Sequence, residues 1–287
     1  MQEAQTSNLI ESSIITVLDE FEQLYSDCPR DAETISFELV IAGKTVPFHI
    51  NVADKQATLA DIVPPARRLS EKLTNLFLDR LRKNGQPAPC RKGCAACCSY
   101  LIPLSIPEVF CLREELLSMP ADDSREILRA CLDTAEKILN SRSQKSYLES
   151  VSENGQFQTN QMSKWYAGLK LACPFLSDGL CMLYEQRPLA CREHLVTGSS
   201  FFCQPDHGGE PTVAAMPISV LEAVGRLTAE LEGLDIEAVM LPLAFPWAQN
   251  NLPRMEHTWP AVTMVKRFVE ILEEMAVGNA ETSAVLT

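Results

Sequence analysis

Residues 90–98 read Cys-Arg-Lys-Gly-Cys-Ala-Ala-Cys-Cys, so one short loop carries four thiols, those of Cys90, Cys94, Cys97 and Cys98. A second, more widely spaced group follows far downstream, at Cys173, Cys181, Cys191 and Cys203. Thiolate sulfur is a soft donor, and loops that present several thiolates at gaps of two or three residues can wrap zinc, iron or an iron–sulfur cluster. The two segments therefore predict a metal centre that joins distant parts of the chain.

Eight thiols exceed the four protein ligands that one zinc ion or one four-iron cluster takes. The surplus is consistent with two sites, with ligand exchange or with cysteines kept free for reaction, and spacing alone does not choose among these. Neighbouring Cys97 and Cys98 point in different directions, so we expect them to serve different sites, or only one of them to bind metal. Cys111 and Cys131 lie on or beside apolar helical stripes, and we expect them, like Cys28, to act as small buried hydrophobic residues.

Composition and charge limit the partners of the chain. Hydrophobic residues make up 46% of the sequence and charged residues 22%, which is ordinary for a globular protein. The net charge of -13 disfavours binding to phosphate backbones, so no nucleic-acid partner is expected. The longest apolar run, 238–248, contains two prolines and is shorter than the roughly 20 residues of a membrane span, so no membrane partner is expected either. A protein partner stays unknown.

The N-terminal residues favour a cytoplasmic location. They are acidic, with no Lys or Arg before Arg30, which is the reverse of an export signal. A reducing compartment keeps thiols reduced, so eleven cysteines there favour metal binding or redox chemistry over a framework of disulfides.

Hydrophobic periodicity predicts a mainly α fold, a helical domain with a small N-terminal β-hairpin, organised around the cysteine-rich metal site. Alternating apolar residues at 35–41 and 46–52 predict the hairpin. Apolar spacing of three and four predicts the helices, which we place at 8–25, 59–81, 105–117, 121–148, around 165–166, 220–231 and 262–272. Ser105 and Glu108 form a capping box that opens one of them. Residues 152–160 are polar and indicate a loop.

Four segments follow from this pattern. We expect an N-terminal helix and hairpin at 1–56 and a cysteine-cluster metal-binding domain at 57–210. C-terminal helices at 211–276 should pack on that domain, and a disordered tail should occupy 277–287.

The second cysteine segment contains Cys-Pro-Phe-Leu at 173–176, Gly-Leu-Cys at 179–181 and Tyr-Glu-Gln-Arg-Pro-Leu-Ala-Cys-Arg at 184–192. With the first segment, this pattern resembles the YkgJ family of cysteine-cluster proteins, described as zinc- or iron-chelating domains, over roughly residues 90–192. Flagellin lysine-N-methylases carry a related, more distant cysteine pattern. The resemblance implies a bound metal or cluster and suggests a modifying activity. Its metal-ligand positions match Cys90, Cys94, Cys97, Cys98, Cys173, Cys181 and Cys191, and Cys203 is added because it lies close in the sequence.

Cations and histidines near these cysteines are further candidates. Arg187 and Arg192 are placed to offset the negative charge of several thiolates and to donate hydrogen bonds to sulfur, although each could equally be an exposed surface cation. His194 and His207 could complete a mixed site, but a lone loop histidine is more often solvated, so neither joins the expected ligand set.

Three functions compete. The leading hypothesis is an iron-sulfur cluster or iron held by the clustered cysteines, in a redox reaction or in the modification of a protein or small molecule. The alternative is a zinc-stabilised structural or interaction module without catalysis. A radical S-adenosylmethionine enzyme is a third reading, since Cys90, Cys94 and Cys97 match its spacing and residues 208–210 read Gly-Gly-Glu, but the helical pattern lacks the strand–helix repeats of that fold.

Overall fold

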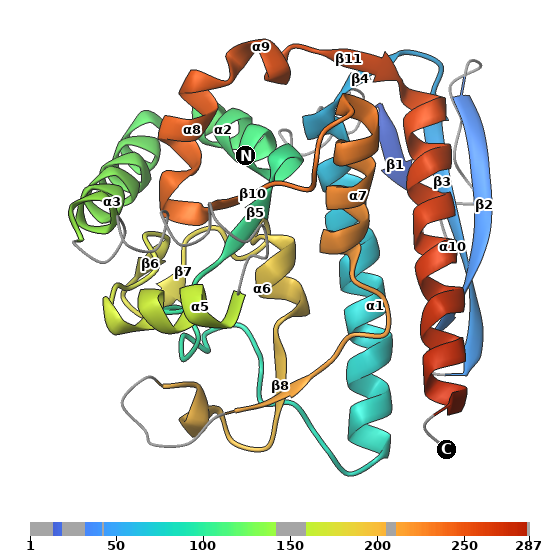
Figure 1. The fold of residues 1–287 in the computed structure, drawn as a ribbon, viewed down its shortest axis with the longest axis horizontal. Coiled ribbons are helices and arrows are strands. Elements are labelled where there is room, and N and C mark those ends of the chain that lie inside the picture. The colour runs from blue at the N-terminus through green and yellow to red at the C-terminus, as the bar shows by residue number, and fades with distance from the viewer. Residues whose placement is uncertain (1–13, 19–31, 42, 142–158, 205–210, 286–287) are drawn as a thin grey trace, which may run out of the picture.

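The computed structural model describes residues 14–18, 32–41, 43–141, 159–204 and 211–285 (Figure 1). The fold is mainly α with a small N-terminal antiparallel sheet, which confirms the predicted class. In chain order the elements are β1 (Ile15–Val17), β2 (Ala32–Ile41), β3 (Lys44–Ala53), β4 (Gln56–Thr58), η2 (Leu59–Ile62), α1 (Val63–Lys83), β5 (Pro103–Ser105), α2 (Ile106–Ser118), α3 (Ala121–Asn140), α5 (Thr159–Gly168), β6 (Leu176–Ser177), β7 (Leu180–Cys181), α6 (Leu189–Glu193), β8 (Leu195–Thr197), η3 (Ser200–Cys203), β9 (Thr212–Ala214), α7 (Val220–Glu232), β10 (Ala238–Met240), η4 (Leu241–Leu243), α8 (Ala244–Asn250), α9 (Leu252–Met255), β11 (Thr258–Pro260) and α10 (Ala261–Val285).

The N-terminal sheet has the order β1-β3-β2, and all its strands are antiparallel. The hairpin β2–β3 confirms the alternating pattern: Phe37 and Phe48 are directly opposite in the register and stack with ring centroids 5.4 Å apart. The helix expected at 8–25 is wrong where the structure describes it, because Ile15–Val17 form β1 and pair with β3. Apolar Ile15 and Val17 are buried on one face of that strand, so a period of two wins over helical spacing there.

Helices α1 and α10 cover the buried face of this sheet, with α10 running alongside β2 and β3 (Figure 1). Pro64 and Pro65 lie in the first turn of α1, where a missing N–H costs no helical hydrogen bond, so the helix continues unbroken. It ends at Asn84, and Gly85 follows with a φ of +73°. The helix expected at 59–81 is confirmed from Val63 onward, while residues 59–62 form the 3-10 helix η2.

Helix α2 begins at the predicted capping box, in which Ser105 and Glu108 exchange hydrogen bonds. Helix α3 occupies Ala121–Asn140 and ends there, since Ser141 is extended, so it is shorter than the helix expected to residue 148; residues 142–148 lie outside the described residues. Most of the loop expected at 152–160 also lies outside them, but α5 already begins at Thr159. Helices α2, α3 and α8 form the side of the molecule opposite α10 (Figure 1).

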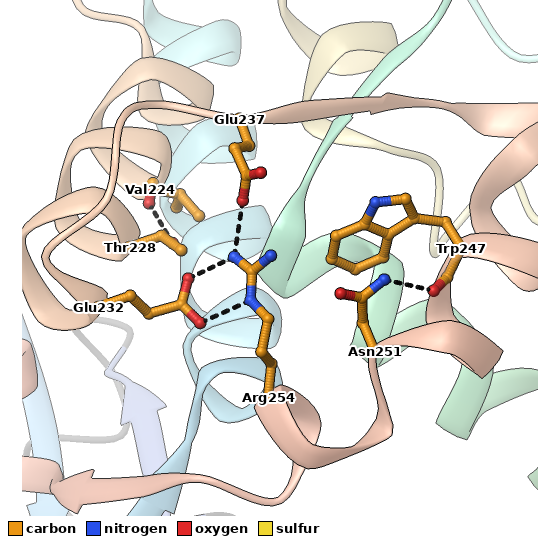
Figure 2. Close-up of polar contacts among 7 residues, drawn as sticks. All are labelled: Val224, Thr228, Glu232, Glu237, Trp247, Asn251 and Arg254. Atoms are coloured by element: carbon orange, nitrogen blue, oxygen red, sulfur yellow. Dashed lines mark hydrogen bonds and ion pairs between the residues drawn. The ribbon is translucent and has the colours of Figure 1, made fainter.

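A partly buried ion network ties the end of α7 to α9. Figure 2 shows the Arg254 guanidinium donating to both carboxylate oxygens of Glu232, at 2.9 and 2.6 Å, and to Glu237 at 2.7 Å. The guanidinium also lies over the Trp247 ring, 5.2 Å from its centroid. The Asn251 amide donates to the Trp247 carbonyl at 2.8 Å. The segment after α7 is therefore fixed although its helices are short.

Residues of the expected N-terminal, metal-binding and C-terminal segments contribute to one hydrophobic core, which includes Leu39, Leu69, Phe110, Val224 and Phe268. Helix α10 continues to Val285, so the backbone is helical over 277–285, where we expected a disordered tail. None of the helices within the described residues is both long and apolar enough to cross a membrane.

Candidate metal centre

All eight cysteines predicted to bind metal line one cavity of about 700 Å³: Cys90, Cys94, Cys97, Cys98, Cys173, Cys181, Cys191 and Cys203. The loop 90–98 forms one wall and the segment 173–203 forms another, and residues of α1 and the start of β5 close the space. The ten cysteines of the described residues are all free thiols. The fold thus gathers the two cysteine segments around a shared space.

A direct hydrogen bond joins the two segments: the Cys173 N–H donates to the Cys98 carbonyl at 2.6 Å. The first loop is a series of tight turns, in which the Cys94 N–H donates to Arg91 O and the Cys98 N–H to Ala95 O, each at 3.0 Å. Gly93 has a φ of +85°, a conformation that side chains disfavour, so glycine is needed to turn the chain into Cys94. These turns therefore fix the backbone positions from which the cysteine side chains of the first loop project.

Cys181 is placed by a two-residue hairpin. Strands β6 and β7 pair Leu176 with Cys181, and the turn between them is Asp178-Gly179, with φ values of +49° and +76°. Asp-Gly is the preferred sequence for a turn with two positive φ angles. The Asp178-Gly179 pair that forms this turn is visible in the sequence.

Cys191 lies on the short helix α6, which a buried carboxylate anchors. Glu108 Oε1 accepts from the Leu189 N–H at 2.7 Å, while its Oε2 accepts from the backbone and hydroxyl of Ser105 at 3.0 and 2.9 Å. Glu108 is 1% exposed. One carboxylate thereby caps α2 and the first turn of α6 together. The capping box was readable from the sequence, but the contact with Leu189 was not.

The other end of α6 is held in the same way. Glu193 accepts from the Ser219 hydroxyl at 2.7 Å and from the Val220 and Leu221 N–H groups at 2.8 and 3.1 Å, so it caps α7. Burial nevertheless raises the pKa of Glu193 to about 7. Cys191 therefore stands between two carboxylate anchors that join it to α2 and α7.

Some surroundings of the sulfurs disfavour the charged thiolate form of cysteine, and others stabilise it. Burial raises the pKa of Cys173 to about 12 and that of Cys191 well above its usual value. Backbone N–H groups of Phe175 and Leu183 donate to the sulfurs of Cys173 and Cys181, which lowers the pKa of each thiol. Without metal the buried thiols are neutral at pH 7, and the amide donors are in place to stabilise the thiolates that a metal requires.

The two predicted arginines have different surroundings. The Arg187 guanidinium lies over the Tyr184 ring, 4.2 Å from its centroid. The contact with Cys98, together with burial, raises the pKa of Cys97, and burial raises that of Cys181; the Arg187 charge opposes both rises. Buried Arg192 instead donates to the backbone carbonyls of Arg187, at 3.1 Å, and of Glu185. Both line the cavity, and the Arg192 guanidinium is held by these two backbone carbonyls. Arg192 braces the turn that precedes Cys191.

Two further side chains share the cavity wall. His194 caps the end of α6, and its Nε2 is buried without a hydrogen-bond partner. Burial lowers the pKa of its imidazole, so the ring is neutral at pH 7. Its edge meets the Tyr100 ring at 5.8 Å between centroids. Nothing in the sequence marked Tyr100. His207 lies outside the described residues.

The remaining cysteines do not line the cavity. Cys111 and Cys131 are buried in the hydrophobic core, as expected, and Cys131 is near enough to Cys173 for the two thiols to interact electrostatically. Cys28 lies outside the described residues.

The donor chemistry fits a thiolate-bound metal, because soft sulfur ligands, amide donors and a guanidinium converge on one space. Within the described residues, however, no three His, Cys, Asp or Glu side chains are already close enough to hold an ion. Bonds of about 2.3 Å between zinc and sulfur would require the thiols to rotate inward. The backbone of both loops is in place, and rotation of the cysteine side chains would set the final ligand geometry.

Comparison with protein families matches residues 89–208 to the CxxCxxCC family, whose description reads "Putative zinc- or iron-chelating domain". Neither the curated proteins nor the solved structures give a match. The matched segment contains all eight cavity cysteines and ends just beyond Cys203. Over this segment the chain is therefore similar to a cysteine-cluster domain that chelates zinc or iron.

Proposed function

We propose that this protein holds iron, as an iron–sulfur cluster or as thiolate-bound ions, in the cysteine-lined cavity and uses it in a redox or modification reaction. One observation carries the proposal: eight free thiols from two remote segments line a single cavity. The family match supports metal binding through cysteines. The choice of iron and the reaction are our inference.

The surroundings of the cavity support a redox role. A thiolate-bound iron centre supplies or accepts single electrons, and its potential depends on burial, on nearby charge and on hydrogen bonds to sulfur. All three are present: desolvation raises the pKa of the half-buried Cys191 thiol, Arg187 provides positive charge, and amides donate to Cys173 and Cys181.

The size of the cavity supports a modification reaction. A volume of about 700 Å³ falls in the range of pockets that bind small organic ligands. Apolar walls from Leu101, Ile102 and Leu241 adjoin the cysteines, so a substrate group could lie beside the metal. The distant resemblance to flagellin lysine-N-methylases agrees with such a use.

Anaerobic purification of the full chain tests this proposal directly. We expect brown protein with broad visible absorption that bleaches on reduction, and iron with or without acid-labile sulfide on analysis. Colourless protein that contains stoichiometric zinc and no iron would overturn the redox role while leaving metal binding intact.

A structural zinc module is the second candidate, and one observation favours it. Cys173 and Cys181 pack directly against the main hydrophobic core, so metal bound there would contribute to folding. Chelation of zinc should then unfold the protein, with no loss of a redox signal. The radical S-adenosylmethionine reading gains no support, since every strand pairing among the described residues is antiparallel, whereas that barrel needs parallel strands.

A further inference from the structure

We propose that the surface beside the cysteine cavity is a docking site for an acidic protein partner. This docking surface comprises the exposed cations Arg80, Lys83 and Arg91 and the exposed aromatic pair Phe201 and Phe202. The partner presents carboxylates to the cations and an apolar side chain to the rings. The inference goes beyond the proposed function and does not depend on a bound metal.

The three cations of the docking surface have no ion-pair partner among the described residues. Arg80 and Lys83 lie in the last turn of α1, and Arg91 follows the first cysteine of the loop 90–98. All three are exposed. They therefore present uncompensated positive charge on a chain whose net charge is -13.

Neighbouring acidic residues do not cancel this charge, because they are already paired. Asp79 accepts from Arg82 at 2.9 Å, and Glu185 accepts from Lys92 at 2.7 Å. Both pairs are exposed and neutral as units, so the surface around them keeps its local excess of positive charge.

Packing brings the end of α1 and the first cysteine loop together. The Gln86 N–H donates to the Leu81 carbonyl at 2.9 Å, so the chain turns back where the helix ends. Ala88 and Cys90 then pack against the small hydrophobic cluster that includes Leu81. Arg91 follows directly, so its charge lies near the charges at the end of α1, at the lower end of the molecule in Figure 1.

The aromatic pair adjoins the cavity from η3. Phe201 is 51% exposed and Phe202 44%, and their rings meet edge to face with centroids 5.8 Å apart. Ser200 and Cys203, which precede and follow the pair, line the cavity, and so does Arg91. Strand β8, which leads into η3, packs against the end of α1 through the same small cluster. Exposed aromatic groups of this kind are typical of protein interfaces, where a buried ring supplies much of the binding energy.

Charge favours a protein as the occupant. A long polyanion such as RNA, or an anionic membrane, extends beyond the three cations and meets the repulsive field of a chain with a net charge of -13. A protein with a local acidic patch meets the cations at close range, where complementary charge speeds association and fixes orientation. Because Arg91 lines the cavity, a partner bound here lies beside the thiols.

Fluorescence anisotropy with the full chain tests the proposal, and the probe is a labelled synthetic peptide in which Glu alternates with Leu. We expect binding at low ionic strength that weakens at high ionic strength, because salt screens exposed charges. The triple variant Arg80→Glu/Lys83→Glu/Arg91→Glu should weaken binding at least about tenfold.

A matched control separates local docking from the effect of net charge. Arg125, Arg129 and Lys137 are exposed cations on α3, which lies away from the end of α1 (Figure 1). The triple variant Arg125→Glu/Arg129→Glu/Lys137→Glu changes the net charge by the same amount and should bind the peptide as the unchanged protein does.

The aromatic pair is tested separately. Phe201→Ala/Phe202→Ala should weaken binding about fivefold, because the rings then no longer pack against the leucines of the peptide. Leu139→Ala, which removes an exposed apolar side chain on α3, is the control and should leave affinity unchanged. Circular dichroism verifies that each variant is folded, and the salt dependence of the unchanged protein requires no variant.

Absence of peptide binding by the unchanged protein would overturn the proposal, and so would equal losses in the two triple variants. Single-stranded RNA or phosphatidylserine vesicles that bind as tightly as the peptide would identify a different occupant and overturn it too. Sedimentation at low ionic strength provides the last comparison: self-association that the triple variant at the docking surface abolishes would mean that the occupant is a second copy of this chain. None of these measurements needs bound metal, so their outcome is independent of the test for iron.

Discussion

At the scale of single residues, Arg187 is the side chain whose charge reaches the thiols, while Arg192 braces the backbone. Replacing Arg187 by Gln should remove charge that stabilises thiolates and lower metal affinity about tenfold. Competition with a chromophoric chelator measures this change. Arg80→Gln, an exposed cation on α1, is the control and should leave affinity unchanged. Equal affinities for both variants would show that Arg187 has no influence on the site.

The cysteines themselves fall into two classes at this scale. Cys191→Ser should lower metal content and destabilise the fold, because its thiol lines the cavity between two anchored helices. Cys111→Ser should leave metal content unchanged, since that thiol lies in the core, beside Glu115. Elemental analysis of the purified variants decides the matter, and equal loss of metal in both would show that the cysteines are wrongly sorted.

At the scale of elements, Glu108 is the joint between α2, β5 and α6. Glu108→Gln should lower the free energy of unfolding by about 1–3 kcal/mol, because an amide cannot accept all the hydrogen bonds that the buried carboxylate accepts. Urea denaturation measures the loss. The exposed Glu114 on the same helix gives the control, and Glu114→Gln should change stability by less than about 0.5 kcal/mol. Similar losses in both variants would contradict the anchoring role.

The Arg254 network is the equivalent joint between α7 and α9. Arg254→Gln should cost about 2 kcal/mol, since it leaves the largely buried Glu232 carboxylate, 9% exposed, without its two-point partner. The exposed pair of Arg82 with Asp79 provides the comparison, and Arg82→Gln should cost less than about 0.5 kcal/mol. Thermal melts that shift by the same amount for both would contradict this assignment.

Elements with local signals were predictable, and those with remote partners were not. The β2–β3 hairpin, the capping box at Ser105 and the helical spacing of α1 all follow from nearby residues. Strands β4 and β5 gave no local signal, because each is only three residues long. Strand β4 pairs with β11, about 200 residues later in the chain, and β5 pairs with β10, about 140 residues later. Strand β1 could not be predicted from nearby residues either, because its extended conformation depends on pairing with β3.

At the scale of the whole molecule, bound metal should stabilise the fold and do so more strongly as pH rises. The metal-free protein carries protons on the buried thiols of Cys173 and Cys191, whose pKa values are raised, and the metal-bound form does not. Loading therefore releases protons, and higher pH favours the bound state. Metal at 100 times its dissociation constant should add about 2.7 kcal/mol.

Thermal melts with and without a chelator, at pH 6 and pH 8, measure this effect. The difference in melting temperature between metal-bound and chelated protein should be larger at pH 8. A difference that shrinks at pH 8 would mean that proton release does not accompany binding.

The sequence predicted which cysteines line the cavity better than it predicted how the residues around them are arranged. Thiol spacing was enough to name the eight residues that line the cavity, because clustered cysteines have few other uses. The roles of Arg187 and Arg192 and the nearness of Tyr100 to His194 depend on tertiary contacts. No local pattern encodes those contacts.

The hydrogen bond between Cys173 and Cys98 has a consequence for how the protein is made. During synthesis the first cysteine loop leaves the ribosome long before Cys203 does, so the nascent chain exposes four unpaired thiols that no later segment yet covers. If the cavity binds metal through both segments, as we propose, the site can be completed only after the second segment has been synthesised and its Cys173 N–H has met the Cys98 carbonyl.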